Sequence, residues 1–170
     1  MISMTKRHWA GAILWLAGTG LALADGLPRP SADVVLTVGG AIGVANSPEG
    51  AAFDLGMLEA IDPVQIETTT IWTEGVQVFR GVPLARLVQD VEAGGTVILV
   101  SALNDYTVEI PLSDAVEDGP ILAYEQNGKR LSVRDKGPLW LVYPYDAKTE
   151  YQSEVVYARS VWQVAHMEFR

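Results

Sequence analysis

Short runs of alternating hydrophobic and polar residues cover most of the chain, and Gly, Pro and Asn separate these runs. This pattern is typical of short strands joined by turns. The segments that we expect to be strands are residues 34–38, 64–72, 76–79, 96–100, 106–110, 121–125, 131–133 and 139–143. Asn127-Gly128 is the strongest turn signal, and it predicts a hairpin between 121–125 and 131–133.

Helical spacing is limited to a few short segments. Asp54 is placed to cap a helix that Asp62-Pro63 stops, and Pro83 suits the first turn of a helix whose apolar residues recur through Val91. Residues 111–117 predict a short helix or turn, and residues 155–169 fit either a helix near 157–163 or a closing strand. Because strands and helices do not alternate regularly, we expect an α+β domain with mostly antiparallel or mixed sheets.

The first 24 residues have the features of an export signal. Lys6 and Arg7 precede the apolar segment 9–23, and Ala22-Leu23-Ala24 has the small-x-small form that signal peptidase accepts. The alternative is an uncleaved membrane anchor, but the apolar segment is shorter than the roughly 20 residues that a spanning helix needs. We therefore expect cleavage after Ala24, a single periplasmic domain over 25–170, and no stable membrane insertion.

Composition excludes several classes of function. The net charge is -9, and the one short basic cluster, residues 129–136, has no aromatic residues interleaved, so we expect no nucleic-acid partner. The chain has no Cys, which excludes disulfides and thiolate metal sites. After residue 24, His166 is the single histidine, and no G-x-S-x-G motif accompanies it. Gly39, Gly40 and Gly43 predict a turn rather than a phosphate-binding loop, since no helix opens there.

Three motifs occur in order along the chain: G-V-P-L at 81–84, A-L-N-D-Y at 102–106, and K-G-P-L-W-L-V-Y-P at 136–144. With these motifs the chain resembles the oxidoreductase molybdopterin-binding domain family, which has the sulfite oxidase fold, and specifically its small exported members. The resemblance implies a mixed α+β fold in which a pterin lies in a cleft between sheets, with its phosphate held by basic side chains and backbone amides.

The chain departs from that family at three positions. In the enzymes a cysteine ligates molybdenum, and the resemblance places this position within residues 68–70, at Thr68. A threonine hydroxyl is a poor ligand for a site that uses soft donors. Trp140 stands where the enzymes carry an arginine, and Arg159-Ser160-Val161-Trp162 resembles their K-S-x-K segment with one base missing. Exported enzymes of the family generally use a twin-arginine signal, whereas Lys6-Arg7-His8 fits general, unfolded export.

We therefore expect no cofactor in the exported protein, although the resemblance implies that molybdopterin could be one. The first expected function is a non-catalytic periplasmic module that binds a small anion or a protein partner. The candidate binding residues are Thr68, Asn104, Asp105, Tyr106, Arg134, Lys136, Tyr143, Tyr145, Arg159 and Ser160. The alternative is a molybdopterin-dependent oxidoreductase without a protein thiolate. Trp72, Trp140 and Trp162 are expected to be core residues.

Overall fold

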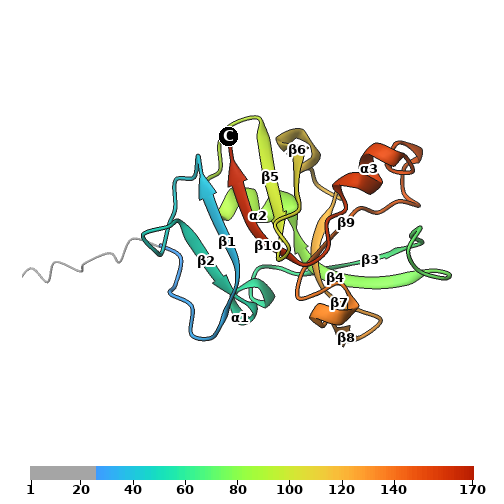
Figure 1. Cartoon of the computed structure of the whole chain (residues 1–170), viewed down its shortest axis with the longest axis horizontal. Helices are drawn as coiled ribbons and strands as arrows, with labels where there is room; N and C mark the ends of the chain where they lie inside the picture. The colour runs from blue at the N-terminus through green and yellow to red at the C-terminus, as the bar shows by residue number, and fades with distance from the viewer. Residues whose placement is uncertain (1–25) are drawn as a thin grey trace, which may run out of the picture.

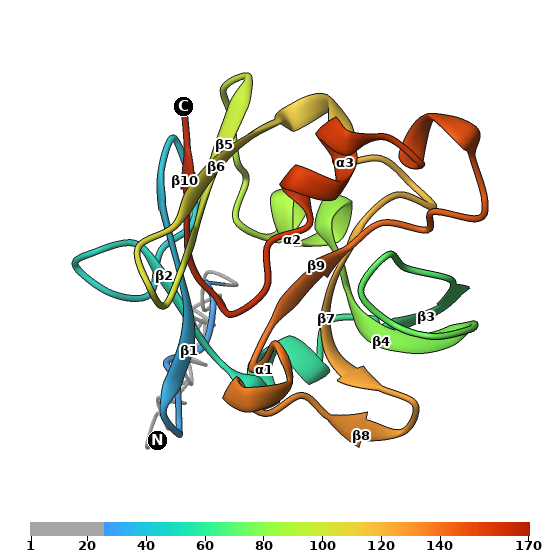
Figure 2. The ribbon, with the colours of Figure 1, turned by 45° about the vertical axis from the view of Figure 1, so that its right-hand side comes forward.

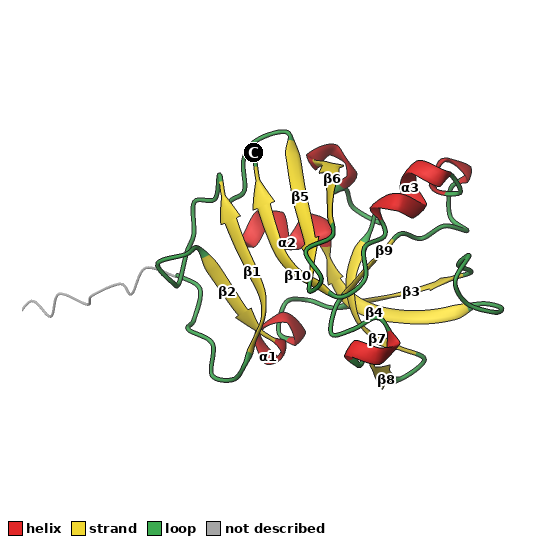
Figure 3. Ribbon diagram, viewed as in Figure 1, coloured by secondary structure: helices red, strands yellow, loops and turns green. Residues whose placement is uncertain are grey.

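The computed structural model describes residues 26–170, so the predicted export signal lies outside the described residues. Within this range ten strands form two sheets, and three short α-helices and three 3-10 turns connect them. Figure 1 shows the two sheets side by side, and Figure 3 shows how little of the chain is helical. The expected α+β fold with mixed sheets is confirmed. No helix within residues 26–170 has the length and hydrophobicity needed to cross a membrane.

The first sheet contains the first and the last strand of the described chain. Its strands, in spatial order, are β2 (Ala51–Asp54), β1 (Val34–Gly40), β10 (Val164–Phe169), β5 (Val97–Ala102) and β6 (Thr107–Pro111). β1 and β10 are parallel and the other pairs are antiparallel. Gly40 has a φ of 82°, and a Cβ there would lie 2.1 Å from the Phe169 carbonyl oxygen, so this close approach of β1 to β10 requires glycine.

The second sheet consists of antiparallel pairs. Its order is β3 (Val64–Thr68), β4 (Gln77–Pro83), β7 (Ile121–Gln126) and β8 (Lys129–Arg130), and β9 (Trp140–Val142) also pairs with β7. The helix α2 (Leu84–Asp90) directly follows β4 and lies between the two sheets (Figures 1 and 2). Its Leu84 and Leu87 side chains are buried, so α2 joins the two sheets through one hydrophobic core.

The other helical elements are α1 (Leu55–Glu59), α3 (Glu154–Arg159) and the 3-10 turns η1 (Leu112–Asp114), η2 (Val133–Asp135) and η3 (Thr149–Tyr151). Asp54 caps α1 as expected, since its Oδ1 accepts a hydrogen bond from Met57 N at 2.8 Å. Its Oδ2 accepts from Ser31 N at 2.7 Å and Ala32 N at 3.0 Å, which ties the leading segment to the sheet. These hydrogen bonds, from Met57 first and then Ser31, lower the pKa of Asp54.

Several element boundaries differ from the sequence expectations. The strand expected over 64–72 ends at Thr68, because the Thr70 hydroxyl accepts a hydrogen bond from Trp72 N at 3.1 Å and turns the chain. Residues 131–133 do not form a strand, since Ser132 starts a turn closed by hydrogen bonds from the amides of Asp135 and Gly137. The short strand β2 was not predicted. The ambiguous segment 155–169 contains both alternatives, most of α3 followed by β10.

Candidate functional site

A half-open cleft of about 470 Å³ lies where the end of β5 and the start of β6 face α3. Four aromatic side chains line it, Trp72, Tyr106, Tyr157 and Trp162. The remaining lining residues are uncharged and smaller: Ala102, Asn104, Ala158, Ser160 and Val161. The cleft therefore offers flat apolar surfaces with a few hydrogen-bonding groups and no charged side chain among its lining residues.

Trp72 is the centre of the aromatic cluster beneath this cleft. Its ring makes edge-to-face contacts with the rings of Trp140, Tyr145, Tyr157 and Trp162, at centroid distances between 5.8 and 6.3 Å. Edge-to-face packing is a preferred geometry for aromatic pairs. The cluster thus joins β9 and α3 to the loop between β3 and β4, and it fixes the position of the lining rings.

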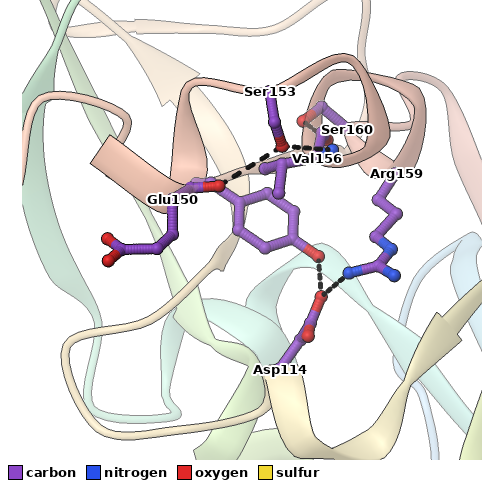
Figure 4. Close-up of polar contacts among 7 residues, drawn as sticks. Asp114, Glu150, Ser153, Val156, Arg159 and Ser160 are labelled. Carbon is purple, nitrogen blue, oxygen red and sulfur yellow. Dashed lines mark hydrogen bonds and ion pairs between the residues drawn. The ribbon is translucent and has the colours of Figure 1, made fainter. Parts of the chain in front are cut away.

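A polar bridge holds α3 beside the cleft. The Tyr143 hydroxyl donates to Asp114 Oδ2 at 2.8 Å, and Arg159 Nη1 donates to the same oxygen at 3.0 Å (Figure 4). Burial, followed by the negative charge of Asp114, raises the pKa of Tyr143 well above its ordinary value. The phenol therefore remains a hydrogen-bond donor, and the charge of Arg159 is matched by Asp114.

A second chain of hydrogen bonds anchors the end of α3. The Tyr145 hydroxyl donates to Ser160 Oγ at 2.6 Å, and Ser160 Oγ donates to the Val156 carbonyl at 2.8 Å. Burial raises the pKa of Tyr145 to about 12. At the other end of the helix, the Ser153 hydroxyl accepts from Val156 N, as Figure 4 shows. Both ends of this six-residue helix are thus held by side chains.

The structure brings some of the predicted site residues together at the cleft. Asn104, Tyr106 and Ser160 line it. Tyr145 lies behind Ser160 and is 1% exposed, while Tyr143 and Arg159 form the bridge beside it. Asn104 also shapes the turn before β6, since its Oδ1 accepts from Tyr106 N at 3.2 Å.

The other four predicted residues neither line the cleft nor belong to the hydrogen-bonded groups beside it. Asp105 is exposed in the same turn, with a φ of 63°. Arg134 is exposed on η2, and the Lys136 ammonium lies 5.3 Å from the centre of the Trp140 ring. Neither of these two bases lines the cleft or pairs with Asp114, which is the partner of Arg159.

Thr68, the fourth of these residues, stands where the resemblance implies a metal-ligating cysteine, and its side chain has a structural contact instead. It is 0% exposed, and its hydroxyl accepts a hydrogen bond from Asp146 N at 3.1 Å. The Asp146 carboxylate in turn accepts from Thr69 Oγ1 at 2.7 Å and from Thr69 N at 2.6 Å. These bonds from Thr69, the hydroxyl first, lower the pKa of Asp146. The pair clamps the end of β3 to the loop after β9.

The residues present do not fit a thiolate-bound molybdenum. The sequence has no cysteine, and residues 26–170 contain no group of three His, Asp or Glu side chains placed to hold a metal ion. At the phosphate end that the resemblance implies, Arg159 is paired with Asp114, Arg134 is exposed, and the Lys136 ammonium lies over the Trp140 ring. We therefore derive no chemistry from a bound metal.

Two tryptophans of the cleft were not expected there. Trp140 is fully buried, as predicted. Trp72 is partly buried and packs against the core, but it also lines the cleft. Trp162 lines the cleft and is 38% exposed, so its assignment to the core was wrong. Trp162 and Tyr157 lie in the segment whose structure the sequence left ambiguous. The arrangement of α3 before β10 is what turns both rings toward the cleft.

Comparison with known families gives one match. Residues 60–149, just over half of the chain, match the oxidoreductase molybdopterin binding domain. No curated protein matched the chain. The matched range includes the strands from β3 to β9 and contains all three motifs in full, G-V-P-L, A-L-N-D-Y and K-G-P-L-W-L-V-Y-P. The chain belongs to the oxidoreductase molybdopterin-binding domain family.

Proposed function

We propose that this family member is an exported binding module that works without molybdenum catalysis, and that its aromatic cleft receives an uncharged segment of a partner protein. The observation that carries the proposal is the composition of the cleft: four aromatic rings, two uncharged polar side chains and no charged one. Trp and Tyr are enriched among the residues that contribute most to protein interfaces.

The rim of the cleft supports a protein partner. Tyr106 is 54% exposed, Leu103 in the same turn is 53% exposed, and Trp162 is 38% exposed. Large side chains with this exposure lose apolar surface to a partner when it binds. The Asn104 side chain accepts from Tyr106 N through its Oδ1, and its Nδ2 can donate to the backbone of an extended segment. The partner would thus gain both apolar contact and hydrogen bonds.

A small anion is the less favoured ligand, because the cleft has no positive charge to offset its desolvation. Arg159 is the nearest base in sequence to the lining residues, and Asp114 already neutralises it. Neither Arg134 nor Lys136 lines the cleft, and the Lys136 ammonium lies over the Trp140 ring. An anion in this cleft would be buried without a countercharge.

The absence of a protein thiolate supports the non-catalytic part of the proposal. The sequence has no cysteine, and the Thr68 hydroxyl is occupied by Asp146. The alternative, a molybdopterin-dependent oxidoreductase, is favoured by family membership alone. In that case the pterin dithiolene and oxo groups would have to supply the metal ligands.

Titration with two probes tests the ligand class. The first probe is a capped, uncharged heptapeptide of proline and leucine, and the second is inorganic phosphate. We expect the heptapeptide to change the tryptophan fluorescence and phosphate to leave it unchanged. Trp162→Ala should weaken peptide binding roughly 10-fold or more. Val133→Ala, which changes an exposed apolar side chain outside the cleft, should not. Binding of phosphate without the peptide would overturn the assignment.

Metal analysis tests the non-catalytic part separately. The full chain, with its own N-terminal segment, is expressed in a bacterium that makes molybdopterin and is purified from the periplasm. We expect no stoichiometric molybdenum, no visible absorption band and no pterin fluorescence after denaturation. One molybdenum atom for each chain would establish the oxidoreductase alternative. Recovery of the chain from the cytoplasm alone would contradict export.

A further inference from the structure

A second hollow, of about 610 Å³, lies beside the edge of the second sheet. Val64 and Ile66 of β3 border it, with α2 on one side and the loop before β7 on the other. We call it the acidic groove, because three of its lining residues are carboxylates, Asp62, Glu117 and Asp118, and Arg86 is its one basic residue.

The strand β3, which supplies Val64, Gln65 and Ile66 to the lining of this groove, has an unpaired edge. It is the first strand of the second sheet, and its register with β4 is regular over all five residues. No hydrogen bond from outside this strand pair reaches the backbone of residues 64–67 within the described chain. Unpaired N–H and C=O groups on an edge strand are a template for another strand.

The edges of the first sheet are covered, in contrast. The Asn46 side chain donates to the Ala52 carbonyl at 2.8 Å and accepts from Ala52 N at 2.7 Å, so it satisfies the backbone of Ala52 on β2. At the other edge of that sheet, α3 packs against β6. The edge of β3 differs from these two edges in having no such neighbour within the described residues.

The groove has an excess of negative charge that its own residues do not neutralise. Arg86 is already paired, with Asp62 at 3.0 Å and with Asp90 at 2.8 Å. Glu117 and Asp118 are exposed and take part in no ion pair within residues 26–170. A basic partner would complement these carboxylates, whereas a second copy of this acidic chain would bring like charges together.

We propose that the acidic groove receives an extended basic segment of a partner chain, which adds to the edge of β3 and places lysine or arginine side chains near Glu117 and Asp118. Backbone hydrogen bonds to β3 supply affinity, and alternate side chains of the added strand face the groove. This site lies apart from the aromatic cleft and does not depend on what occupies it.

Three capped hexapeptides test the proposal on the full chain. The first alternates lysine and valine, the second replaces lysine by glutamate, and the third is the first with alternate backbone amides methylated. We expect the basic peptide to bind and to shift the amide NMR signals of residues 64–68. Methylation should weaken binding roughly 10-fold, since it removes the backbone hydrogen bonds, and the glutamate peptide should not bind.

Charge variants of the protein supply the matched control. Glu117→Gln with Asp118→Asn should weaken binding of the basic peptide roughly 5-fold at low salt, and added salt should reduce this difference. Asn tolerates the positive φ of 54° at position 118. Asp33→Asn with Glu49→Gln removes two exposed carboxylates elsewhere and should leave binding unchanged.

Four outcomes would overturn the proposal. Equal binding of the methylated peptide excludes strand addition, and equal binding of the glutamate peptide excludes charge complementarity. If the only amide NMR signals that shift belong to residues of the aromatic cleft, the peptide binds at the cleft and not at β3. A dimer in sedimentation experiments, with the amides of β3 protected from exchange, makes a second copy the occupant. Circular dichroism of each variant establishes that it is folded.

Discussion

The two hollows of this molecule are of similar size but are built from opposite chemistry. Aromatic rings that pack on one another line the cleft, with no charged side chain among the lining residues. The acidic groove has apolar residues of β3 and β7 beside a rim of carboxylates. Ligand binding in the cleft should therefore depend on contact area and be insensitive to salt, whereas binding in the groove should weaken as salt rises.

One polar bridge connects the walls of the two hollows. Asp114 directly precedes Ala115, which lines the groove, and Arg159 lies between Ala158 and Ser160, which line the cleft. The hydrogen bonds from Tyr143 and Arg159 to Asp114 thus hold a segment of each wall in place. The two sites differ in chemistry but share this support.

Replacing Trp72 by alanine should give the largest effect and should separate the two sites. The substitution removes the ring that contacts four other aromatic rings, so we expect a loss of about 3 kcal/mol in the free energy of unfolding. Binding of the uncharged heptapeptide should be lost, while the basic hexapeptide should still bind at the groove. Denaturant unfolding followed by far-UV circular dichroism measures the stability.

Trp162→Ala is the comparison variant for this prediction. Trp162 contacts Trp72 but is 38% exposed, so its removal should cost less than half as much stability and still weaken binding in the cleft. If Trp72→Ala and Trp162→Ala destabilise the protein equally, Trp72 is not the centre of the cluster. If Trp72→Ala also abolishes binding at the groove, the two sites are not separable.

Replacing Asp114 by alanine should affect both sites at once. It leaves the buried Tyr143 hydroxyl without an acceptor and Arg159 without its partner, so we expect a loss of about 2 kcal/mol. Hydrogen exchange should become faster both in α3 and in the segment after η1. Tyr143→Phe keeps the ion pair and should cost less. Faster exchange confined to one of the two segments would contradict a shared support.

The sequence predicted the arrangement of strands better than it predicted the cleft. Alternation and turn residues located most strands, and Asp54 and Pro83 located two helix starts, because these signals act within a few residues. β2 was missed since all four of its residues are buried, which removes the alternation of hydrophobic and polar positions. Local patterns therefore identify most elements, but they miss a short strand that is buried at every position.

The cleft depends on contacts between distant segments, which a single sequence does not display. Asn104, Tyr106 and Ser160 were named for other reasons, two from a turn motif and one from a family motif. Trp72 lies 90 residues before Trp162, yet their rings are in contact. The sequence also grouped Arg134 and Lys136 with Arg159, although only Arg159 pairs with Asp114 beside the cleft. The type of a residue predicts the chemistry of its side chain, but which side chains come together depends on the topology of the fold.

Replacing Thr68 by valine tests the clamp at the end of β3, close to both sites. Valine keeps the shape but leaves Asp146 N without an acceptor, so we expect a loss of about 1 kcal/mol. Thr68→Ser keeps the hydroxyl and should cost less. Urea unfolding of the three proteins measures this. No loss of stability in the valine variant, or a larger loss in the serine variant, would contradict the hydrogen-bonded clamp and assign the role of Thr68 to its methyl group.

The smallest expected effect is a pH dependence of protein stability that arises from the same clamp. Because hydrogen bonds from Thr69 lower the pKa of Asp146, the folded protein holds a proton there less tightly than the unfolded chain. The stabilisation is complete above the ordinary pKa of an aspartate and is lost as pH falls through the lower, folded value. Asp146→Asn should therefore reduce Tm by about 2 °C at pH 7, and the difference from the wild type should disappear near pH 2.

Asp33→Asn changes an exposed carboxylate that makes no hydrogen bond within the described residues, and its difference from the wild type should not change in this way with pH. A difference between Asp146→Asn and the wild type that persists at pH 2 would mean that the carboxylate charge does not strengthen the clamp. The acid sensitivity of the molecule would then come from other carboxylates, such as Asp54, whose pKa is also lowered.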